Sequence, residues 1–241
     1  MAGAIRVGTA GWSIPKPHAA AFDGEGSHLE RYARRFGCVE INSSFYRPHR
    51  PATYARWAAA VPAGFRFAVK LPREVTHQRR LVGVTEVLDR FLGEIAGLGD
   101  RLGPVLVQLP PSLAYDPASV GAFLAALRVR FAGQVVCEPR HPSWFGDVVD
   151  GVLLAHRIAR VAADPAPVPT AAVPGGWLGV TYWRLHGSPE MYYSTYSDPW
   201  LDSVAGPLCD AAAQGGEAWC IFDNTALGGA TGNALDLIGR L

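Results

Sequence analysis

A complete strand–helix–strand unit can be read in residues 105–140, VLVQLPPSLAYDPASVGAFLAALRVRFAGQVVCEPR. The apolar runs at 105–109 and 135–138 are short and rich in valine, which is typical of buried parallel strands. The segment 117–131 between them begins with a proline, which the first turn of a helix accepts because that position has no helical partner for its N–H. Strands that alternate with helices predict a parallel sheet covered by helices.

The same alternation extends over the rest of the chain. We predict strands at 5–9, 39–41, 65–71, 105–109, 135–138, 158–163, 178–186 and 218–222, and helices at 28–36, 52–60, 85–98, 117–131, 148–156, 199–213 and 233–241. Ser27 is a predicted N-cap of the first helix, and Glu30 completes a capping box. The segment 165–176 is rich in proline, alanine and glycine, so we expect the helix after the sixth strand to be missing or replaced.

Eight strands in a chain of 241 residues predict one TIM-like (β/α)8 barrel domain over residues 1–241, near the small end for that fold. The alternative is an open, doubly wound sheet. The barrel is favoured because the count fits and because no G-x-G-x-x-G motif follows the first strand. No internal repeat and no linker divides the chain.

The composition argues against nucleic acid held by overall charge, a membrane span and a disulfide framework. The chain has 22 Lys and Arg against 21 Asp and Glu, a formal charge of +1, so no overall positive field exists to hold nucleic acid. No run of about 18 apolar residues predicts a membrane span, and the first residues lack the apolar core of a signal peptide. The four cysteines form no C-x-x-C motif and are expected to be reduced. We therefore expect a cytoplasmic protein without a membrane partner.

Polar residues occur where the predicted strands end, which is where barrels of this kind carry their sites. Three pairs lie two residues apart, and so on one face of their strands: Glu40 and Asn42, Glu138 and Arg140, Arg184 and His186. Single polar residues end other strands: Lys70, Gln108, Asp164, Asp223 and Asn224. Burial of an unpaired charge costs several kcal/mol, so their repetition favours a functional pocket over packing. Aromatic residues in the same loops suggest a stacking wall: Trp12, Phe45, Tyr46, Trp144, Tyr192, Tyr193 and Trp200.

Several motifs, in order along nearly the whole chain, resemble the YecE-like family, also called domain of unknown function 72. They are GTAGW at 8–12, VEINSSFY at 39–46, FAVK at 67–70, TH at 76–77, VQLPP at 107–111, EPRHPSW at 138–144, RLHG at 184–187 and FDN at 222–224. The resemblance implies a TIM-like barrel and implies no reaction. Asp223 departs from the pair of amides or similar residues that the resemblance leads us to expect at 223–224.

The first functional interpretation is an acid/base or hydrolytic enzyme that acts on a phosphorylated, carboxylated or nucleotide-like ligand, with no cofactor. Glu40 and Glu138 are candidate bases, and His141 and His186 are candidate acids. The remaining candidates bind or orient the ligand: Lys70, Arg140 and Arg184 as anion holders with His77, then Asn42, Gln108 and Asn224, and the wall residues Trp12, Tyr46, Trp144 and Tyr193. The glycine-rich segment 227–233 is a candidate phosphate loop.

Two other interpretations stay open. A divalent-metal nuclease or sugar isomerase would use Glu40, Glu138, Asp164, His141 and His186, although nearby cations would oppose the ion, so we predict no tight metal site and leave weakly held Mg²⁺ open. A binding protein without catalysis would use the same pocket, and in a purely structural account Glu40–Arg184 and Glu138–Lys70 would be ion bridges. Nucleic acid would have to use the basic cluster Arg73, His77, Arg79 and Arg80. The oligomeric state is not predicted.

Overall fold

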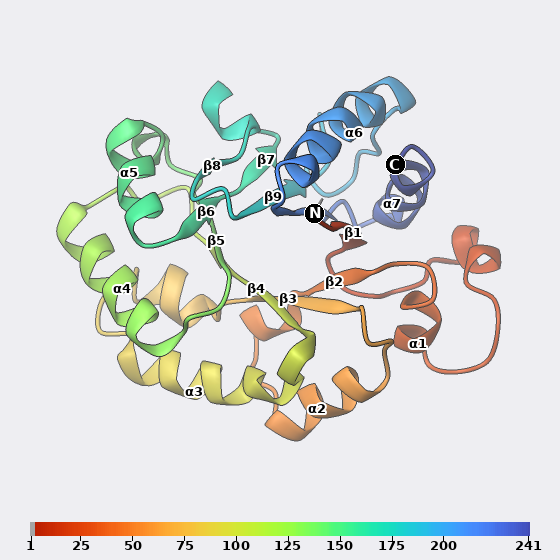
Figure 1. Ribbon diagram of the computed structural model, residues 1–241, viewed down its shortest axis with the longest axis horizontal. Coiled ribbons are helices and arrows are strands. Elements are labelled where there is room, and N and C mark those ends of the chain that lie inside the picture. The colour runs from red at the N-terminus through yellow and green to blue at the C-terminus, as the bar shows by residue number, and fades with distance from the viewer. Residues whose placement is uncertain (1–2) are drawn as a thin grey trace.

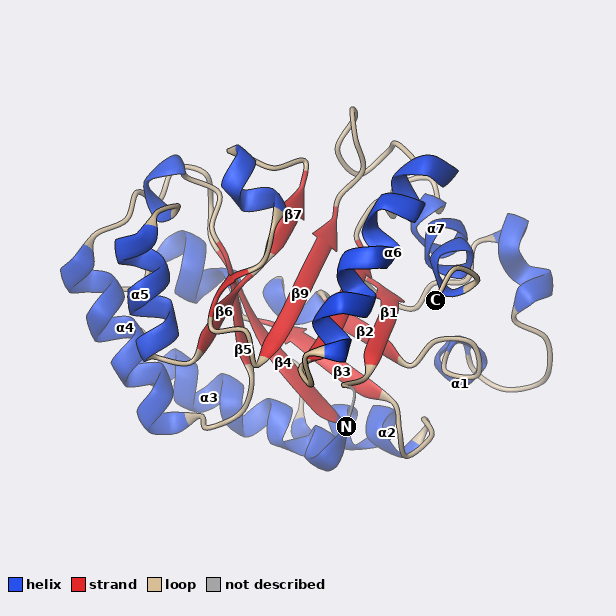
Figure 2. Cartoon of the chain, turned by 45° about the horizontal axis from the view of Figure 1, so that its top comes forward, coloured by secondary structure: helices blue, strands red, loops and turns tan. Residues whose placement is uncertain are grey.

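The computed structural model describes residues 3–241, in which strands and helices alternate along the chain (Figure 1). The main strands are β1 (Ile5–Thr9), β2 (Cys38–Ile41), β3 (Arg66–Lys70), β4 (Leu102–Gln108), β5 (Val135–Glu138), β6 (Ile158–Arg160), β7 (Ala162–Asp164), β9 (Val180–Leu185) and β10 (Glu217–Phe222). The helices are α1 (His28–Tyr32), α2 (Pro51–Ala59), α3 (Thr85–Ile95), α4 (Pro117–Arg130), α5 (Asp147–Ala155), α6 (Asp198–Ala213) and α7 (Gly229–Ile238). Figure 2 shows the strands in the centre and the helices around them.

The strands form two sheets, ordered β1-β10-β9-β7 and β2-β3-β4-β5-β6-β8, where β8 is the short strand Gly175–Gly176. Every pair is parallel except β6 with β8. On one side the sheets are continuous, because only Val161 separates β6 from β7 and its N–H donates to Cys137 O at 2.8 Å. On the other side a bridge between Ala10 and Glu40 connects β1 to β2. The strands therefore follow one another around a TIM-like barrel, as predicted.

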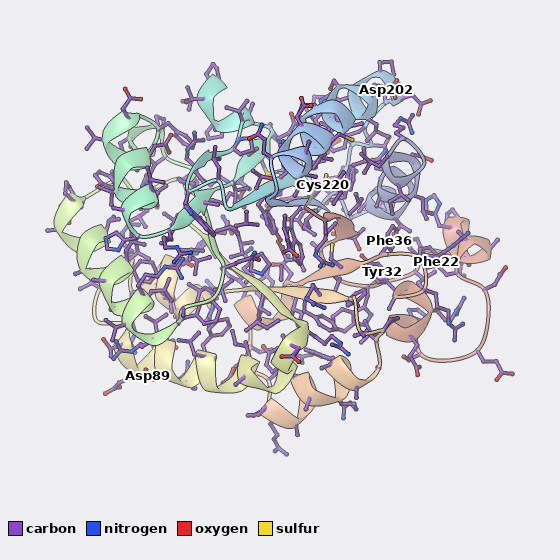
Figure 3. The ribbon with its side chains drawn as sticks, in the orientation of Figure 1. Phe22, Tyr32, Phe36, Asp89, Asp202 and Cys220 are labelled. Carbon is purple, nitrogen blue, oxygen red and sulfur yellow. The ribbon has the colours of Figure 1, made fainter. Side chains whose placement is uncertain are left out.

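The contact between β1 and β2 depends on a buried tyrosine. The Tyr32 hydroxyl accepts from Thr9 N–H at 2.9 Å and donates to Cys38 O at 3.1 Å, so it replaces a direct hydrogen bond between the two strands. Tyr32 packs against Phe22 and Phe36 (Figure 3). Gly8 lets the strands approach, because a Cβ there would lie 2.3 Å from Cys38 O. Side-chain packing therefore closes this part of the ring.

The inside of the barrel changes from apolar to charged along the strand direction. The lower layer is buried and mostly apolar: Cys38, Ala68, Leu106, Val136, Tyr182 and Ile221. Strand side chains alternate between the two faces, so the next inward residue is two positions further on. These next residues are polar: Glu40, Lys70, Gln108, Glu138, Arg184 and Asp223. The pleat of the strands thus carries six polar side chains to the carboxyl-terminal mouth.

A short turn replaces the helix after the sixth strand, as predicted. It contains the 3-10 turn Pro169–Ala172 and β8 (Gly175–Gly176), which pairs antiparallel with β6. Arg160 holds this segment in place: its Nη1 donates to Thr170 O at 2.9 Å and to Val173 O at 3.2 Å, and its Nε donates to Asp150 at 2.8 Å.

The first and the last helix, α1 and α7, can be compared with their predicted boundaries. Both hydrogen bonds of the capping box of α1, between Ser27 and Glu30, are present. The predicted start of the last helix at 233 is wrong. Helix α7 begins at Gly229, because Gly228 turns the chain with a φ of 82° and Ala230 N–H bonds to Asn224 O. Most of the segment 227–233, the candidate phosphate loop, therefore lies in the first turns of the packed helix α7. No helix within residues 3–241 has the length and apolar character that crossing a membrane requires.

Candidate functional site

Arg184, on β9, is the centre of a buried ion network at the mouth of the barrel. Its Nε and Nη2 donate to the two oxygens of Glu40 at 3.0 and 2.7 Å. Its Nη1 donates to Glu138 Oε2 at 2.6 Å, and Nη2 also donates to Asp223 Oδ2 at 2.9 Å. The three carboxylates come from β2, from β5 and from the residue after β10. One guanidinium therefore ties together strands from both sheets.

His186 and Arg140 extend this network toward the cavity. His186 places Nδ1 3.1 Å from Asp223 Oδ2 and Nε2 2.9 Å from Glu138 Oε1. Arg140 Nη2 lies 2.5 Å from Glu138 Oε1 and 2.7 Å from His186 Nε2. Arginine can only donate, so its contact with His186 is a hydrogen bond when Nε2 is unprotonated and Nδ1–H points to Asp223.

The network keeps its carboxylates ionised. Burial would raise the pKa of Glu138, but Arg140, Arg184 and His186 outweigh burial and hold this pKa well below 4.5. Burial also acts on Asp223, and the positive charge of Arg184 together with the hydrogen bond from His186 lowers its pKa. Burial would lower the pKa of Arg184, but the three carboxylates raise it well above its usual value. Each charge is compensated only while its partners stay in place.

A cavity of about 670 Å³ opens above the network. Its described lining residues are Phe45, Tyr46, Lys70, Arg73, His77, Gln108, Pro111, Arg140, Pro165, Ala166, Pro167, Met191 and Tyr192. Three of these side chains are cationic, and none of the described lining residues carries a carboxylate. Arg140 Nε is buried and has no hydrogen-bond partner within residues 3–241. The acids of the site are beneath the floor, and the cationic side chains of Lys70, Arg73 and Arg140 line the open space.

Lys70 ends β3 inside this cavity. Only 7% of the residue is exposed, and Nζ lies 4.2 Å from the centre of the Phe45 ring. Within the described chain, Nζ forms neither a hydrogen bond nor an ion pair with another side chain. Burial lowers the pKa of Lys70 to about 8, with a further contribution from Arg184, while Glu40, Asp223 and Glu138 oppose the change.

His77 lies beside Lys70 in the turn Glu74–Gln78 that follows β3. Its ring centre is 4.9 Å from that of Phe45, and Nδ1 lies 2.8 Å from Thr76 Oγ1. Burial, Lys70 and Arg73 all lower the pKa of His77. A neutral imidazole next to a buried amine is therefore available in the cavity at neutral pH.

The structure separates the sequence-predicted site residues into three groups. Five line the cavity: Tyr46, Lys70, His77, Gln108 and Arg140. Four form the network beneath it: Glu40, Glu138, Arg184 and His186. Six do not line the cavity: Trp12, Asn42, His141, Trp144, Tyr193 and Asn224.

Packing and capping explain most of the third group. Trp144 is buried and donates Nε1–H to Leu113 O at 2.8 Å. Trp12 packs edge-on against Trp57 and Phe67. His141 caps the short turn Pro142–Trp144 through its Nδ1.

Asn224 and Asp164 have local partners as well. Asn224 donates to Ser194 O and to Asn233 Oδ1, both at 3.0 Å. Asp164 accepts from Tyr196 at 2.8 Å. These two side chains hold the loops that surround the mouth.

Other contacts that were considered from the sequence also differ from those in the structure. The pair Glu138–Lys70 is not formed, because Arg184 and Arg140 take the Glu138 oxygens. The basic cluster after β3 is divided: Arg73 and His77 line the cavity, Arg79 pairs with Glu74 at 2.7 Å, and Arg80 bonds to Ser112. Within residues 3–241, His, Cys, Asp and Glu side chains form no group of three or more that could hold a metal ion. The acids of the network instead surround a guanidinium.

Sequence reasoning missed the cavity contacts of Arg73, Met191 and 165–167, and it left the part played by Asp223 open. Tyr192, named only as a loop aromatic, lines the cavity in place of Tyr193. Tyr192 has a φ of 71°, which is unusual for a residue other than glycine and turns this loop over the mouth. The proline-rich composition of 165–167 was the only signal for that part of the wall.

The sequence as a whole identifies the family. A model of the family described as protein of unknown function DUF72 matches residues 6–241. The chain belongs to the DUF72 family. The DUF72 chain is 31% identical to the UPF0759 protein YecE of Escherichia coli strain K12 over 175 residues, which are 69% of this chain and 61% of YecE. It is 29% identical to YunF of Bacillus subtilis strain 168 over 153 residues, 58% of this chain and 52% of YunF. The chain thus spans about 61% of the length of the YecE protein that it matches.

Solved structures confirm the fold of this DUF72 chain. A DUF72 family protein of Thermotoga maritima MSB8 superposes with a TM-score of 0.81 and 24% identity, with 98% of each chain covered. One from Enterococcus faecalis V583 gives 0.82 and 22%, covering 98% of this chain and 94% of the other. The apo form of 3-keto-D-glucoside 4-epimerase YcjR from E. coli gives 0.54 and 11%, with 98% of each chain covered. These similarities establish the barrel and assign no reaction.

Proposed function

We propose that the cavity binds a small molecule bearing a carboxylate or phosphate group, and that the protein performs acid/base chemistry on it. The observation that carries this proposal is the charge of the lining: Lys70, Arg73 and Arg140 face a space bordered by no carboxylate of the described residues. Arginine binds planar carboxylates and phosphates through paired N–H groups. Arg140 Nε is a buried donor without a partner there.

The residues have distinct roles in this proposal. Arg140 and Arg73 hold the anion, and Tyr46 and Tyr192 border it. Lys70 and His77 transfer protons, because both line the cavity and both have a pKa lowered toward or below neutrality. We assign Glu138 a positioning role instead of that of a base, because its Oε2 accepts a hydrogen bond from Arg184 and its Oε1 forms an ion pair with Arg140.

Glu40 is a positioning residue for the same reason. Its Oε1 accepts from Arg184, and its Oε2 accepts from Arg184 and from Tyr182 at 2.9 Å. Glu40 is also 0% exposed and is not among the described residues that line the cavity. We also propose a cytoplasmic location, which agrees with four free cysteines, three of them buried.

Calorimetric titration with malonate and with inorganic phosphate tests the anion site. We expect saturable binding of at least one of them. In Arg73→Met, which removes an exposed side chain, binding should weaken about 10-fold, because a hydrogen bond to a charged group contributes about 1.5–3 kcal/mol and 1.4 kcal/mol is tenfold. Arg66→Met is the matched control, since Arg66 begins the same strand and lies at the opposite end of the barrel. Absence of binding, or an equal loss in Arg66→Met, would overturn the proposal.

A further inference from the structure

Lysine is rare in this chain and one of its lysines is buried. Lys16 and Lys70 are the two lysines among 22 Lys and Arg residues. Lys16 is exposed and begins the short turn Lys16–Ala21, away from the cavity. Lys70 is buried at the end of β3 and lines the cavity. The two amines therefore differ in burial and in position relative to the cavity, so Lys16 serves as an internal reference for the reactivity of Lys70.

The surroundings of Lys70 disfavour its use as a structural cation. A buried ammonium is normally paired, because desolvation of a single charge is costly. Glu40, Glu138 and Asp223 are nearby, but Arg184, Arg140 and His186 already engage them. Nζ instead lies over the face of Phe45. Desolvation and a neighbouring cation are the two conditions that make a lysine amine nucleophilic.

The cavity also places a proton carrier and an anion holder around this amine. His77 packs on Phe45 as Lys70 does, and its Nδ1 is engaged by Thr76, so Nε2 is the nitrogen that remains for the ligand. Arg140 borders the same space with an unpaired Nε. An amine, an imidazole and an anion site thus converge on one small volume.

We propose that Lys70 forms a Schiff base with an anionic substrate that carries an aldehyde or ketone, such as a 2-oxo acid or a phosphorylated carbonyl compound. This inference rests on the proposed function and specifies its substrate class. Arg140 and Arg73 hold the carboxylate or phosphate, and the carbonyl carbon faces Nζ. A lysine that acts in this way is a catalytic residue and not a charge that fills the barrel mouth.

The step balances without any further reactant. Lys70 Nζ, as the neutral amine, attacks the carbonyl carbon, and the new C–N bond forms as the C=O π bond opens. His77 transfers the two protons that the nitrogen loses, one after the other, to the former carbonyl oxygen: the first gives the carbinolamine, and the second makes its hydroxyl group a water molecule. That oxygen leaves as water, and the C=N bond of the imine forms. The substrate loses one oxygen and the amine two hydrogens, which together are the released water.

Reductive trapping tests the inference. The full chain is incubated at pH 7 with glyoxylate or pyruvate and sodium cyanoborohydride, and the adducts are mapped by peptide mass spectrometry. We expect the reduced adduct on Lys70 to exceed that on Lys16 by at least about 10-fold, because an ordinary lysine titrates near 10.4 and is almost fully protonated at this pH. The α-amino group titrates near 8 as well, so adducts are counted site by site. Malonate should suppress the adduct on Lys70 and leave that on Lys16 unchanged.

Two variants provide the controls. Lys70→Arg should abolish the cavity adduct while it keeps a cation there, and Lys16→Arg should leave the adduct on Lys70 intact. If malonate or phosphate binds but Lys70 is trapped no more than Lys16, the Schiff-base inference is wrong and the proposed function stands. If neither anion binds and no adduct forms, both are wrong. Trapping of Lys70 that malonate does not suppress would also contradict the inference, because the substrate anion would then not share the cavity.

Discussion

Replacement of Arg184 by methionine is the most severe single change that we predict for this barrel. The guanidinium is 1% exposed and forms ion pairs with Glu40, Glu138 and Asp223. Removal of one partner from a buried ion pair typically destabilises a protein by about 3–5 kcal/mol, because the remaining charge is left uncompensated. Three carboxylates lose their main partner here. We therefore expect a loss of about 5 kcal/mol, a large part of the 5–15 kcal/mol that is typical of a folded domain.

The pH dependence of stability should change sign in this variant. In the wild type the pKa of Glu138 is held well below 4.5, so its stabilising contribution is present above pH 4.5 and is lost as the pH falls through the lowered pKa. In Arg184→Met, Asp223 stays buried but loses the charge that most lowers its pKa, so we expect its pKa to rise above its unfolded value. Protons then bind the folded state preferentially, and stability should increase as the pH falls from 7 toward 5.

Urea denaturation between pH 5 and 8 measures both effects. The matched control is Arg130→Met, which removes an ion pair with Asp89 at the surface of α3 (Figure 3) and should cost below about 1 kcal/mol. If Arg184→Met lost less than about 1 kcal/mol, or became less stable as the pH fell from 7 to 5, our reasoning on the network would be refuted.

Three further substitutions probe other contacts. Gly8→Ala should destabilise the fold by about 1–3 kcal/mol, because its Cβ would clash with Cys38 O, and an unchanged melting temperature would contradict that packing. Tyr182→Phe removes the hydroxyl that donates to Glu40 and should cost about 1.5–3 kcal/mol in urea denaturation, whereas no loss would mean that water replaces the hydroxyl. Arg160→Met should speed limited proteolysis within 165–176, because that side chain holds the segment that replaces a helix. Cleavage at the wild-type rate would refute this role.

The sequence allowed a good prediction of the barrel and of its charged interior. Short valine-rich runs alternated with amphipathic segments, so the strands were predicted within a few residues of their observed bounds. The period of two along a strand then correctly placed Glu138 with Arg140 and Arg184 with His186 on one face. Those pairs meet because all strands end at the same mouth.

The loops could not be predicted in the same way. The direction of an aromatic side chain there depends on backbone turns that have no periodic pattern. Trp144 turns inward to bond to Leu113, and the positive φ of Tyr192 brings that ring, and not Tyr193, to the cavity. The sequence also could not show that Lys70 has no ion-pair partner within residues 3–241, because this depends on which acids pair with the two arginines and with His186. The choice of ion-pair partners depends on three-dimensional positions and cannot be predicted from the spacing of residues along the chain.

The titration of Lys70 with and without an anion shows whether the cavity holds an anion next to this amine. Competitive acetylation across pH 6–11 reports the two lysines separately, because each is in its own peptide. The account predicts a midpoint for Lys70 near pH 8 that saturating malonate shifts upward, since a bound anion stabilises the ammonium, with no shift for Lys16. A midpoint for Lys70 that neither malonate nor phosphate shifts would contradict the claim that this cavity holds an anion beside the buried amine.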